Sequence, residues 1–142
     1  MSTERGLLDS LRPLMQSRYK LDDTTFEDVF ERTTLISVKE GKPIFKEGTH
    51  SEFLYVIADG FADVIKKEKK IATVKKGDLL GEMSLLGVDK SSATVTAATP
   101  MSLFKFHKSW FDVLMNRYPE MNTIIVMEAL NRRLEQTELP TE

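Results

Sequence analysis

Two neighbouring stretches of this chain decide the fold that its sequence predicts. Residues 77–86 have the sequence GDLLGEMSLL, and residues 91–97 have the sequence SSATVTA. The pattern indicates a strand end, a glycine turn, one short helical turn that begins near Glu82, a loop and a further strand. The first backbone N–H groups of a helical turn have no partner within the helix and point outward from its N-terminus. The stretch therefore predicts a place where an anion can bind.

Short apolar runs with a period of two residues lie on both sides of this stretch and predict β-strands. Asp59–Gly60, between two of the runs, is typical of a tight hairpin. Strands this short, at such regular spacing, favour a barrel or a jelly roll. The expected strands are Leu35–Val38, Pro43–Phe45, Phe53–Ile57, Phe61–Ile65, Ile71–Val74, Ala93–Ala97 and Ser102–Phe106.

Apolar residues at helical spacing predict helices before the first strand. Residues 6–19 carry leucines and a methionine at this spacing, and Pro13 predicts a break or kink among them. Thr24 followed by Glu27 resembles a capping box, so a second helix is expected to begin there. We expect residues 1–22 to form an N-terminal helical extension.

Two further helices are expected after the last strand. Ser109 can cap a turn that begins at Trp110, a residue that we expect to anchor this turn in the core under the barrel. Pro119 suits the first position of the final helix. We place the main domain at residues 23–136 and a polar tail at residues 137–142.

The composition is typical of a soluble globular protein with one domain. The 142 residues carry a formal net charge of −2 with lysines and acids interleaved, so no nucleic-acid partner is expected. No run of about 18 apolar residues occurs, which predicts no membrane span, and the N-terminus lacks the pattern of a secretory signal. The absence of cysteine excludes disulfides and thiolate sites and fits a cytoplasmic location.

Candidate catalytic and metal-binding residues are scarce. The two histidines, His50 and His107, are far apart in the sequence, and neither has a partner at a metal-ligand spacing. No nucleophile, base and acid come together along the sequence. We therefore expect no enzyme activity, no metal site and no cofactor.

The region from about Phe26 to Leu134 resembles the cyclic-nucleotide-binding domain family of the catabolite-activator type. The resemblance implies a mainly β fold with flanking helices: an eight-stranded jelly-roll barrel, N-terminal helices and two C-terminal helices. It also implies that residues 77–97 form a phosphate-binding cassette, with cAMP or cGMP as the possible ligand. The matching positions are Gly48, Tyr55–Ile57, Gly60, Gly77–Asp78, Gly81–Glu82 and Ala93–Val95.

The resemblance assigns roles to individual residues of this cassette. Gly81 and Glu82 match the Gly-Glu pair of the family, whose glutamate accepts the ribose 2′-hydroxyl. The N–H groups of Met83 and Ser84 are expected to face the phosphate oxygens. Ser92 is expected to contact the phosphate through its hydroxyl and, as in some members, to help favour guanine over adenine.

One position departs from the family pattern, because Ser91 stands where the family has an arginine against the phosphate. A guanidinium forms a bidentate, charge-assisted bond that a hydroxyl cannot copy. Its loss removes about 1.5–3 kcal/mol, so we expect cAMP and cGMP each to bind more weakly than about 10 μM. Lys90 replaces the lost cation only if the loop is irregular, since alternation along a strand places Lys90 opposite Ser91.

Two functions follow from these observations. The first is a regulatory module that senses a cyclic nucleotide with weak or altered affinity and signals to a partner protein by moving its C-terminal helices. The retained Gly81, Glu82 and Ser92 favour it. The second is a degenerate module that no longer binds cyclic nucleotides and serves as a protein-interaction or dimerisation scaffold, which Ser91 favours. A less anionic small molecule in the same pocket is a third possibility.

The last helix predicts self-association. Met127, Leu130 and Leu134 follow a three-then-four spacing that can join two helices, and the same residues can instead pack on their own barrel. We expect a homodimer through this helix. Because few residues follow Leu134, we expect a stand-alone domain that does not read DNA itself and signals through another protein or through self-association, unless the chain is a fragment of something longer.

Overall fold

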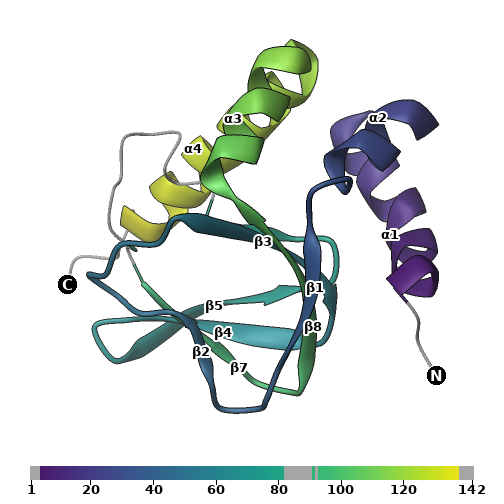
Figure 1. The fold of residues 1–142 in the computed structure, drawn as a ribbon. Coiled ribbons are helices and arrows are strands. Elements are labelled where there is room, and N and C mark those ends of the chain that lie inside the picture. Colours follow the sequence, from purple (N-terminus) through teal and green to yellow (C-terminus); the bar gives the residue numbers. More distant parts are fainter. Residues whose placement is uncertain (1–3, 82–90, 92, 138–142) are drawn as a thin grey trace.

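The computed structural model describes residues 4–81, 91 and 93–137 of the chain (Figure 1). Each predicted strand is present, with ends that differ from the expected ones by at most two residues. In chain order, the elements of the described residues are α1 (Glu4–Tyr19), α2 (Asp23–Val29), β1 (Thr34–Val38), β2 (Pro43–Phe45), β3 (Phe53–Asp59), β4 (Phe61–Lys66), β5 (Lys69–Lys75), β6 (Leu79–Leu80), β7 (Thr94–Ala97), β8 (Met101–His107), α3 (Lys108–Arg117) and α4 (Pro119–Thr137).

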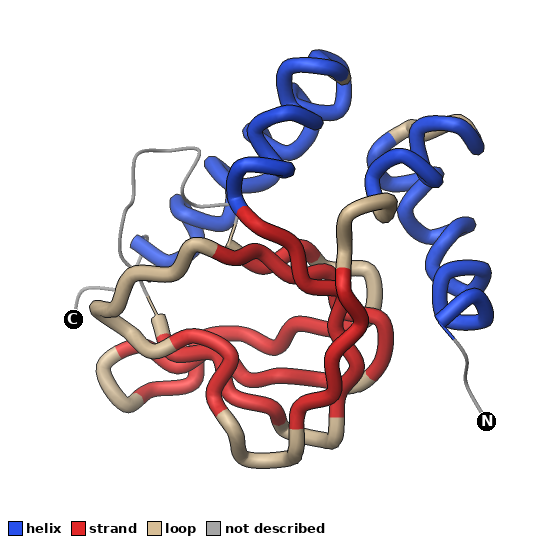
Figure 2. The backbone as a smooth tube through the Cα atoms, viewed as in Figure 1, coloured by secondary structure: helices blue, strands red, loops and turns tan. Residues whose placement is uncertain are grey.

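The strands form two antiparallel sheets that face each other (Figure 2). Sheet A has the strand order β1-β8-β3-β6, and sheet B has the order β2-β7-β4-β5. The helices lie outside the sandwich, on the side of sheet A (Figure 1). This arrangement confirms the predicted mainly β, jelly-roll fold with helices before and after it.

The predicted tight hairpin at Asp59–Gly60 is wrong. The turn is present, but β3 pairs with β6 and β8 in sheet A, whereas β4 pairs with β5 and β7 in sheet B. Both edges of β3 are therefore occupied, and the turn carries the chain from one sheet to the other. A turn signal shows that the chain reverses, but it does not show which strand pairs with which.

Alternation along the strands of sheet A divides the hydrophobic residues between two cores. Along β3, Leu54 and Val56 belong to an outer core between sheet A and the helices, and Ile57 belongs to an inner core between the sheets. Along β8, Phe104 is in the outer core and Leu103 is in the inner core, and both are fully buried. Sheet A is thus covered on both faces.

The predicted break at Pro13 is also wrong, because α1 runs through this residue. Pro13 is exposed, while Leu11, Met15 and Tyr19 on the opposite side are buried in the outer core. Burial of this continuous apolar face stabilises the helix despite the backbone hydrogen bond that a proline removes.

The N-cap of α2 is Asp22 rather than the predicted Thr24. A carboxylate oxygen of Asp22 accepts from the backbone N–H of Thr25 at 2.8 Å. Leu21 before the cap and Phe26 in the first turn are both buried in the outer core, as in a hydrophobic staple. Glu27 instead pairs with Arg5 and Arg12 of α1, so it takes no part in capping.

Helix α3 begins two residues earlier than expected, and its N-cap is His107 instead of Ser109. The imidazole Nδ1 of His107 accepts from the backbone N–H of Ser109 at 3.0 Å. As predicted, Trp110 is buried; its indole N–H donates to the carbonyl of Val29 at 3.0 Å and joins α3 to the end of α2. Helix α4 begins at the predicted Pro119.

The turn between the two sheets depends on Gly60. Its φ of +94° lies in the left-handed region, and an added Cβ would lie 2.6 Å from the carbonyl oxygen of Pro100. We expect Gly60→Ala to lower the free energy of unfolding by about 2–4 kcal/mol, from backbone strain and overpacking together. Chemical denaturation measures this change.

Gly41→Ala is the matched control. Gly41 has a φ of +87°, but nothing lies within 4 Å of an added Cβ. Only backbone strain is expected there, at about 1 kcal/mol. Equal effects of the two substitutions would contradict the close approach at Gly60.

Candidate functional site

Two of the six predicted site residues, Gly81 and Ser91, lie in the part of the chain that the structure describes. Glu82, Met83, Ser84 and Ser92 lie outside the described residues, so their roles stay predictions. The same holds for Lys90, the suggested substitute for the missing arginine. The site is therefore built from the elements that carry Gly81 and Ser91.

Gly81 follows β6 and lies close to Leu54 of β3. Its φ is +102°, and an added Cβ would lie 3.1 Å from Cγ of Leu54 and 3.5 Å from Cζ of Phe45. A side chain has little room here, and the backbone angle is one that glycine adopts readily. These two constraints explain why a glycine stands at position 81 of the predicted cassette.

Ser91 is held by backbone hydrogen bonds to the turn that follows β2. Its N–H donates to the carbonyl of Thr49, and its carbonyl accepts from the N–H of Gly48, both at 2.8 Å. Strand β7 begins only at Thr94, so Ser91 precedes the strand. The alternation argument that placed Lys90 opposite Ser91 therefore does not apply.

Gly81 and Ser91 lie at the same end of the sandwich. Phe45, the last residue of β2, approaches Gly81, and the residues directly after Phe45 form the turn that binds Ser91. The Phe45 ring meets the ring of Tyr55 from sheet A edge-on, with centroids 5.4 Å apart. Burial raises the pKa of the Tyr55 hydroxyl, which stays neutral and able to donate a hydrogen bond.

The aromatic pair of Phe45 and Tyr55 was missed in the sequence. Both residues lie on predicted strands, and the period of two indicates which residues share a face of one strand. The period does not show that β2 and β3 come face to face from different sheets. The fold therefore brings the aromatic pair of Phe45 and Tyr55 to the end of the sandwich where Gly81 and Ser91 lie.

Strand β6, which leads into Gly81, is tied to the helices by Arg18 of α1. The Arg18 guanidinium donates to Asp78 Oδ1 at 2.7 Å and to the carbonyl of Gly77 at 3.2 Å, and both residues directly precede β6. It also binds both carboxylate oxygens of Glu128 in α4, each at 3.0 Å. Arg132 of α4 donates to the carbonyl of Leu79, within β6, at 3.3 Å.

Ion pairs stabilise the junction that Arg18 forms with Asp78 and Glu128. Burial by itself would lower the pKa of Arg18, but its hydrogen bonds with Glu128 and Asp78 outweigh burial and raise that pKa above the ordinary value. Arg18 is therefore cationic at every accessible pH. The junction links α1, the strand before Gly81 and α4 through one side chain.

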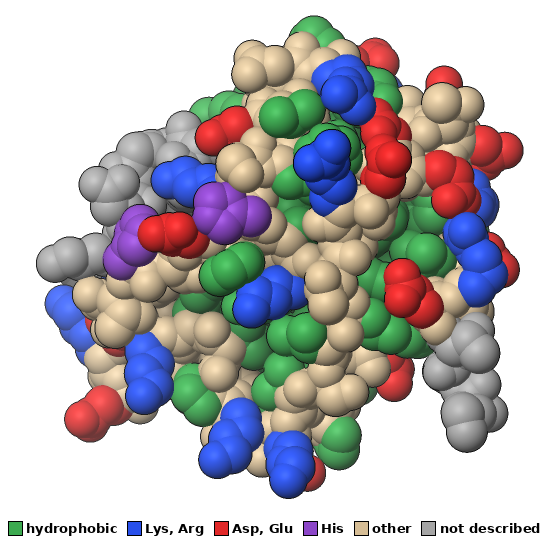
Figure 3. Space-filling view, in the orientation of Figure 1, with side chains coloured by type: hydrophobic (Ala, Val, Ile, Leu, Met, Phe, Trp, Pro, Cys, Tyr) green, Lys and Arg blue, Asp and Glu red, His purple; other side chains and the backbone are tan. Residues whose placement is uncertain are grey.

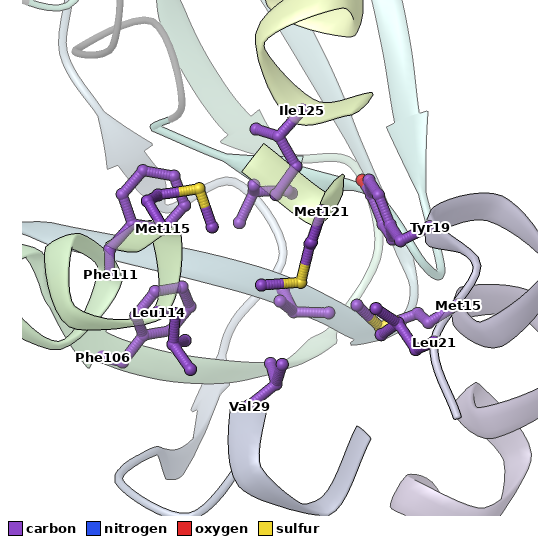
Figure 4. Close-up of a pocket in the computed structure, with 12 residues that line it drawn as sticks. Met15, Tyr19, Leu21, Val29, Phe106, Phe111, Leu114, Met115, Met121 and Ile125 are labelled. Atoms are coloured by element: carbon purple, nitrogen blue, oxygen red, sulfur yellow. The ribbon is translucent and has the colours of Figure 1, made fainter. Parts of the chain in front are cut away.

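An apolar cavity of about 30 Å³ lies between sheet A and the helices, on the side away from the sandwich interior (Figure 4). Its lining comes from α1, α2, α3, α4, Leu21 and the outer face of sheet A, and includes the flexible side chains of Met15, Met115 and Met121. No polar surface lines it, so the lining offers a water molecule no hydrogen-bond partner. The helices are therefore packed less tightly against sheet A here than in a filled core.

Glu52, His107 and Ser109 form a chain of hydrogen bonds at the surface, which sequence reasoning did not expect. The His107 imidazole contacts Glu52 Oε1 through Nε2 at 3.1 Å and Ser109 Oγ through Nδ1 at 3.0 Å. However, Nδ1 also accepts the backbone N–H of Ser109. The imidazole lone pair that a general base needs is thus used to cap α3, and its side chain is 47% exposed.

No helix among the described residues combines the length and the apolar composition that a membrane crossing requires.

Comparison with known proteins identifies the family of this site. The sequence model described as "Cyclic nucleotide-binding domain" matches residues 35–118. This segment includes Gly81, Ser91 and the eight strands of the described residues, except for Thr34, the first residue of β1.

Individual proteins show the same similarity. A cGMP-dependent protein kinase of Eimeria tenella is 33% identical over 107 residues, which are 75% of this chain and 11% of the kinase. A cAMP-dependent protein kinase regulatory subunit of Schizosaccharomyces pombe is 29% identical over 113 residues, which are 79% of this chain and 27% of the subunit. The chain thus spans a minor part of these relatives.

A solved structure agrees in fold. The Catabolite Activator Protein of Thermus thermophilus superposes with a TM-score of 0.72 at 26% sequence identity, over 83% of this chain and 57% of that protein.

The junction at Arg18 has a measurable consequence. We expect Arg18→Met to lower the free energy of unfolding by about 2 kcal/mol, because Asp78 and Glu128 lose their common cation while half-buried. Hydrogen exchange at the amides of Leu79 and Leu80 should accelerate, since β6 is then held less firmly.

Arg5→Met serves as the control. Arg5 also binds two carboxylates, Asp9 and Glu27, but its side chain is 54% exposed. Water screens such pairs, so Arg5→Met should lower the free energy of unfolding by clearly less than Arg18→Met does. An Arg18 variant as stable as the Arg5 variant would show that the junction is not a fixed link.

Proposed function

The chain belongs to the cyclic nucleotide-binding domain family, and we propose that it is a non-enzymatic regulatory module that binds a cyclic nucleotide weakly. In this proposal, binding at the end of the sandwich shifts α3 and α4 against sheet A. A partner protein then recognises the changed position of these helices. The change is a shift between two conformations and involves no chemistry.

The observation that carries this proposal is the link between β6 and the helices. Asp78 before β6, and Leu79 within it, hydrogen-bond to Arg18 of α1 and Arg132 of α4. The predicted cassette, residues 77–97, contains β6, and Gly81 follows β6 directly. A ligand that moves the cassette therefore moves a strand that is hydrogen-bonded to α4, and the apolar cavity leaves the helices room to adjust.

The ligand that we propose is cAMP or cGMP. The relatives named above are cGMP-dependent and cAMP-dependent proteins by description. The half-buried ring of Tyr55, packed on the buried Phe45, offers aromatic surface to a base. The neutral Ser91 supports the weak affinity, because a hydroxyl gives no charge-assisted bond to a phosphate. We expect both nucleotides to bind more weakly than about 10 μM.

A second candidate function is that of a scaffold. Ser91 favours it, since the cation of the family pattern is missing at that position. A scaffold keeps the sandwich fold but no longer binds the ligand. The two functions therefore differ in whether an arginine at position 91 increases the affinity for cyclic nucleotide.

Ser91→Arg tests the sensor against the scaffold. We expect a gain of at least tenfold in affinity for cAMP or cGMP, because the new guanidinium supplies a bidentate bond worth about 1.5–3 kcal/mol. Calorimetric titration measures the gain, and Glu82→Ala in the same variant should abolish it.

Ser37→Arg is the matched control, because Ser37 is an exposed serine in β1, the edge strand of sheet A opposite to β6. It adds the same charge away from Gly81 and should leave the affinity unchanged. A folded Ser91→Arg protein that binds neither nucleotide would support the scaffold and overturn the sensor.

We also propose that two copies of the chain associate through α4. The buried side of this helix, with Met121, Ile125 and Ala129, packs on its own domain, whereas Met127 and Leu130 remain 55% and 41% exposed. These two apolar side chains lie three residues apart on one face, and the spacing continues to Leu134 in the sequence. A second copy of α4 can cover them.

Sedimentation at micromolar concentration tests this association. We expect a homodimer that Leu130→Asp weakens at least tenfold, because a buried carboxylate without a partner opposes association. Val113→Asp, at an apolar residue of α3 that is 40% exposed, should leave the dimer intact. A monomer at all concentrations would rule the proposal out.

A further inference from the structure

Lys105 is a cationic residue on the inner face of sheet A. Along β8 it lies between Phe104 and Phe106, which belong to the outer core, so its side chain shares the opposite face with Leu103 of the inner core. It is half-buried. A lysine is unusual beside Leu103 and Met101 of the inner core, since burial of an ammonium group is costly.

Strand register places Lys105 at the end of the sandwich where Gly81 and Ser91 lie. Lys105 is opposite Tyr55 of β3, and Tyr55 is opposite Leu80 of β6, the residue directly before Gly81. Sheet strands are about 4.8 Å apart, so the three residues form one row across sheet A. Tyr55, in the middle, contacts Phe45 of sheet B.

The chain between β2 and β3 closes this end from the other side. Gly48 and Thr49 hydrogen-bond to Ser91, and three residues later the carbonyl of Glu52 accepts from the N–H of Lys108, just after β8. The rim thus runs from Ser91 to the strand of Lys105. On the face that Figure 3 shows, basic side chains and hydrophobic surface lie together in the region bounded by β3 and β1.

The Lys105 charge has no carboxylate partner among the described residues. Its Nζ lies over the ring of Phe53, 4.1 Å from the centroid. No carboxylate of the described part of the chain is within ion-pair distance of it. Glu52, beside Phe53 in the sequence, pairs with His107. By contrast Lys70, on sheet B, binds Asp63 at 3.2 Å.

We propose that Lys105 supplies the cation that the predicted cassette lacks at Ser91, and that its ammonium group contacts the anionic group of the bound ligand. This inference rests on the proposed function, because it concerns the same ligand. The anion enters from the rim between Ser91 and Phe53, and Lys105 reaches it from sheet A. Tyr55, beside Lys105, is placed to donate a second hydrogen bond.

A purely structural role for Lys105 makes a different prediction. An ammonium over Phe53 shields an aromatic ring that is 37% exposed, and the alkyl stem covers apolar surface. In that role Lys105 affects stability and leaves ligand affinity unchanged. The ligand affinity of Lys105 variants therefore distinguishes the two roles.

The test compares wild type, Lys105→Met and Lys105→Arg in calorimetric titrations with cAMP and cGMP. Methionine keeps an unbranched apolar stem and removes the charge, and arginine keeps the charge. We expect Lys105→Met to weaken the binding of cyclic nucleotide at least fivefold and Lys105→Arg to retain most of it. Adenosine and guanosine, which have no phosphate, should bind both variants as they bind wild type.

Lys75→Met is the matched control. Lys75 of β5 stands opposite Phe61, an exposed phenylalanine, in sheet B. The substitution removes the same charge beside the same kind of ring, and it should leave nucleotide affinity unchanged. Thermal unfolding of each variant shows whether the fold is retained.

If wild type binds nucleotide too weakly to measure, Lys105→Met and Lys105→Arg are compared in the Ser91→Arg variant instead. A loss of threefold or more on Lys105→Met is expected there as well. If nucleotide binds and Lys105→Met binds it as well as its parent does, the inference is overturned and the proposed function stands. If neither wild type nor Ser91→Arg binds either nucleotide, the proposed function fails and this inference fails with it.

Discussion

Burial of sheet A on both of its faces is the constraint on which the rest of the structure depends. Strand β3 alternates between Val56, which faces the helices, and Ile57, which faces sheet B, and β8 alternates in the same way between Phe104 and Leu103. A shift of one residue in either strand would exchange the two cores. This register also places Tyr55 and Lys105 at the end of the sandwich where Gly81 and Ser91 lie, because both residues follow the same alternation.

The helices depend on this sheet in turn. The outer core includes residues of α1, α2, α3 and α4 together with the outer face of sheet A. Two polar contacts make the attachment specific: the Trp110 indole binds the carbonyl of Val29, and Arg18 joins Asp78 to Glu128. Apolar burial supplies most of the stability, and these directional bonds determine which helix surface meets which part of the sheet. The strand before Gly81 is thereby held by α1 and α4.

The candidate site combines what the sequence shows with what it does not. Gly81 and Ser91 lie at one end of the sandwich, as the family resemblance implies, and the left-handed backbone and close contacts of Gly81 explain its identity. The partners of these residues were not foreseen. Phe45 approaches from β2 and Tyr55 from β3, and the two strands belong to different sheets. The roles of Glu82, Met83, Ser84 and Ser92 remain predictions from the family pattern.

The sequence by itself determined the strands, the jelly-roll class and the two terminal helical regions, because periods of two and of 3.6 residues record which side chains of one element share a face. Only the tertiary structure decided that the turn at Gly60 joins two sheets, that α1 passes through Pro13, and that Asp22 and His107 cap their helices. It also decided the junction at Arg18 and the inward position of Lys105. Apart from the two caps, which are local contacts with Thr25 and Ser109, these features depend on residues far apart in the chain, such as Arg18 and Glu128. Local periodicity carries no information about which distant surfaces become neighbours.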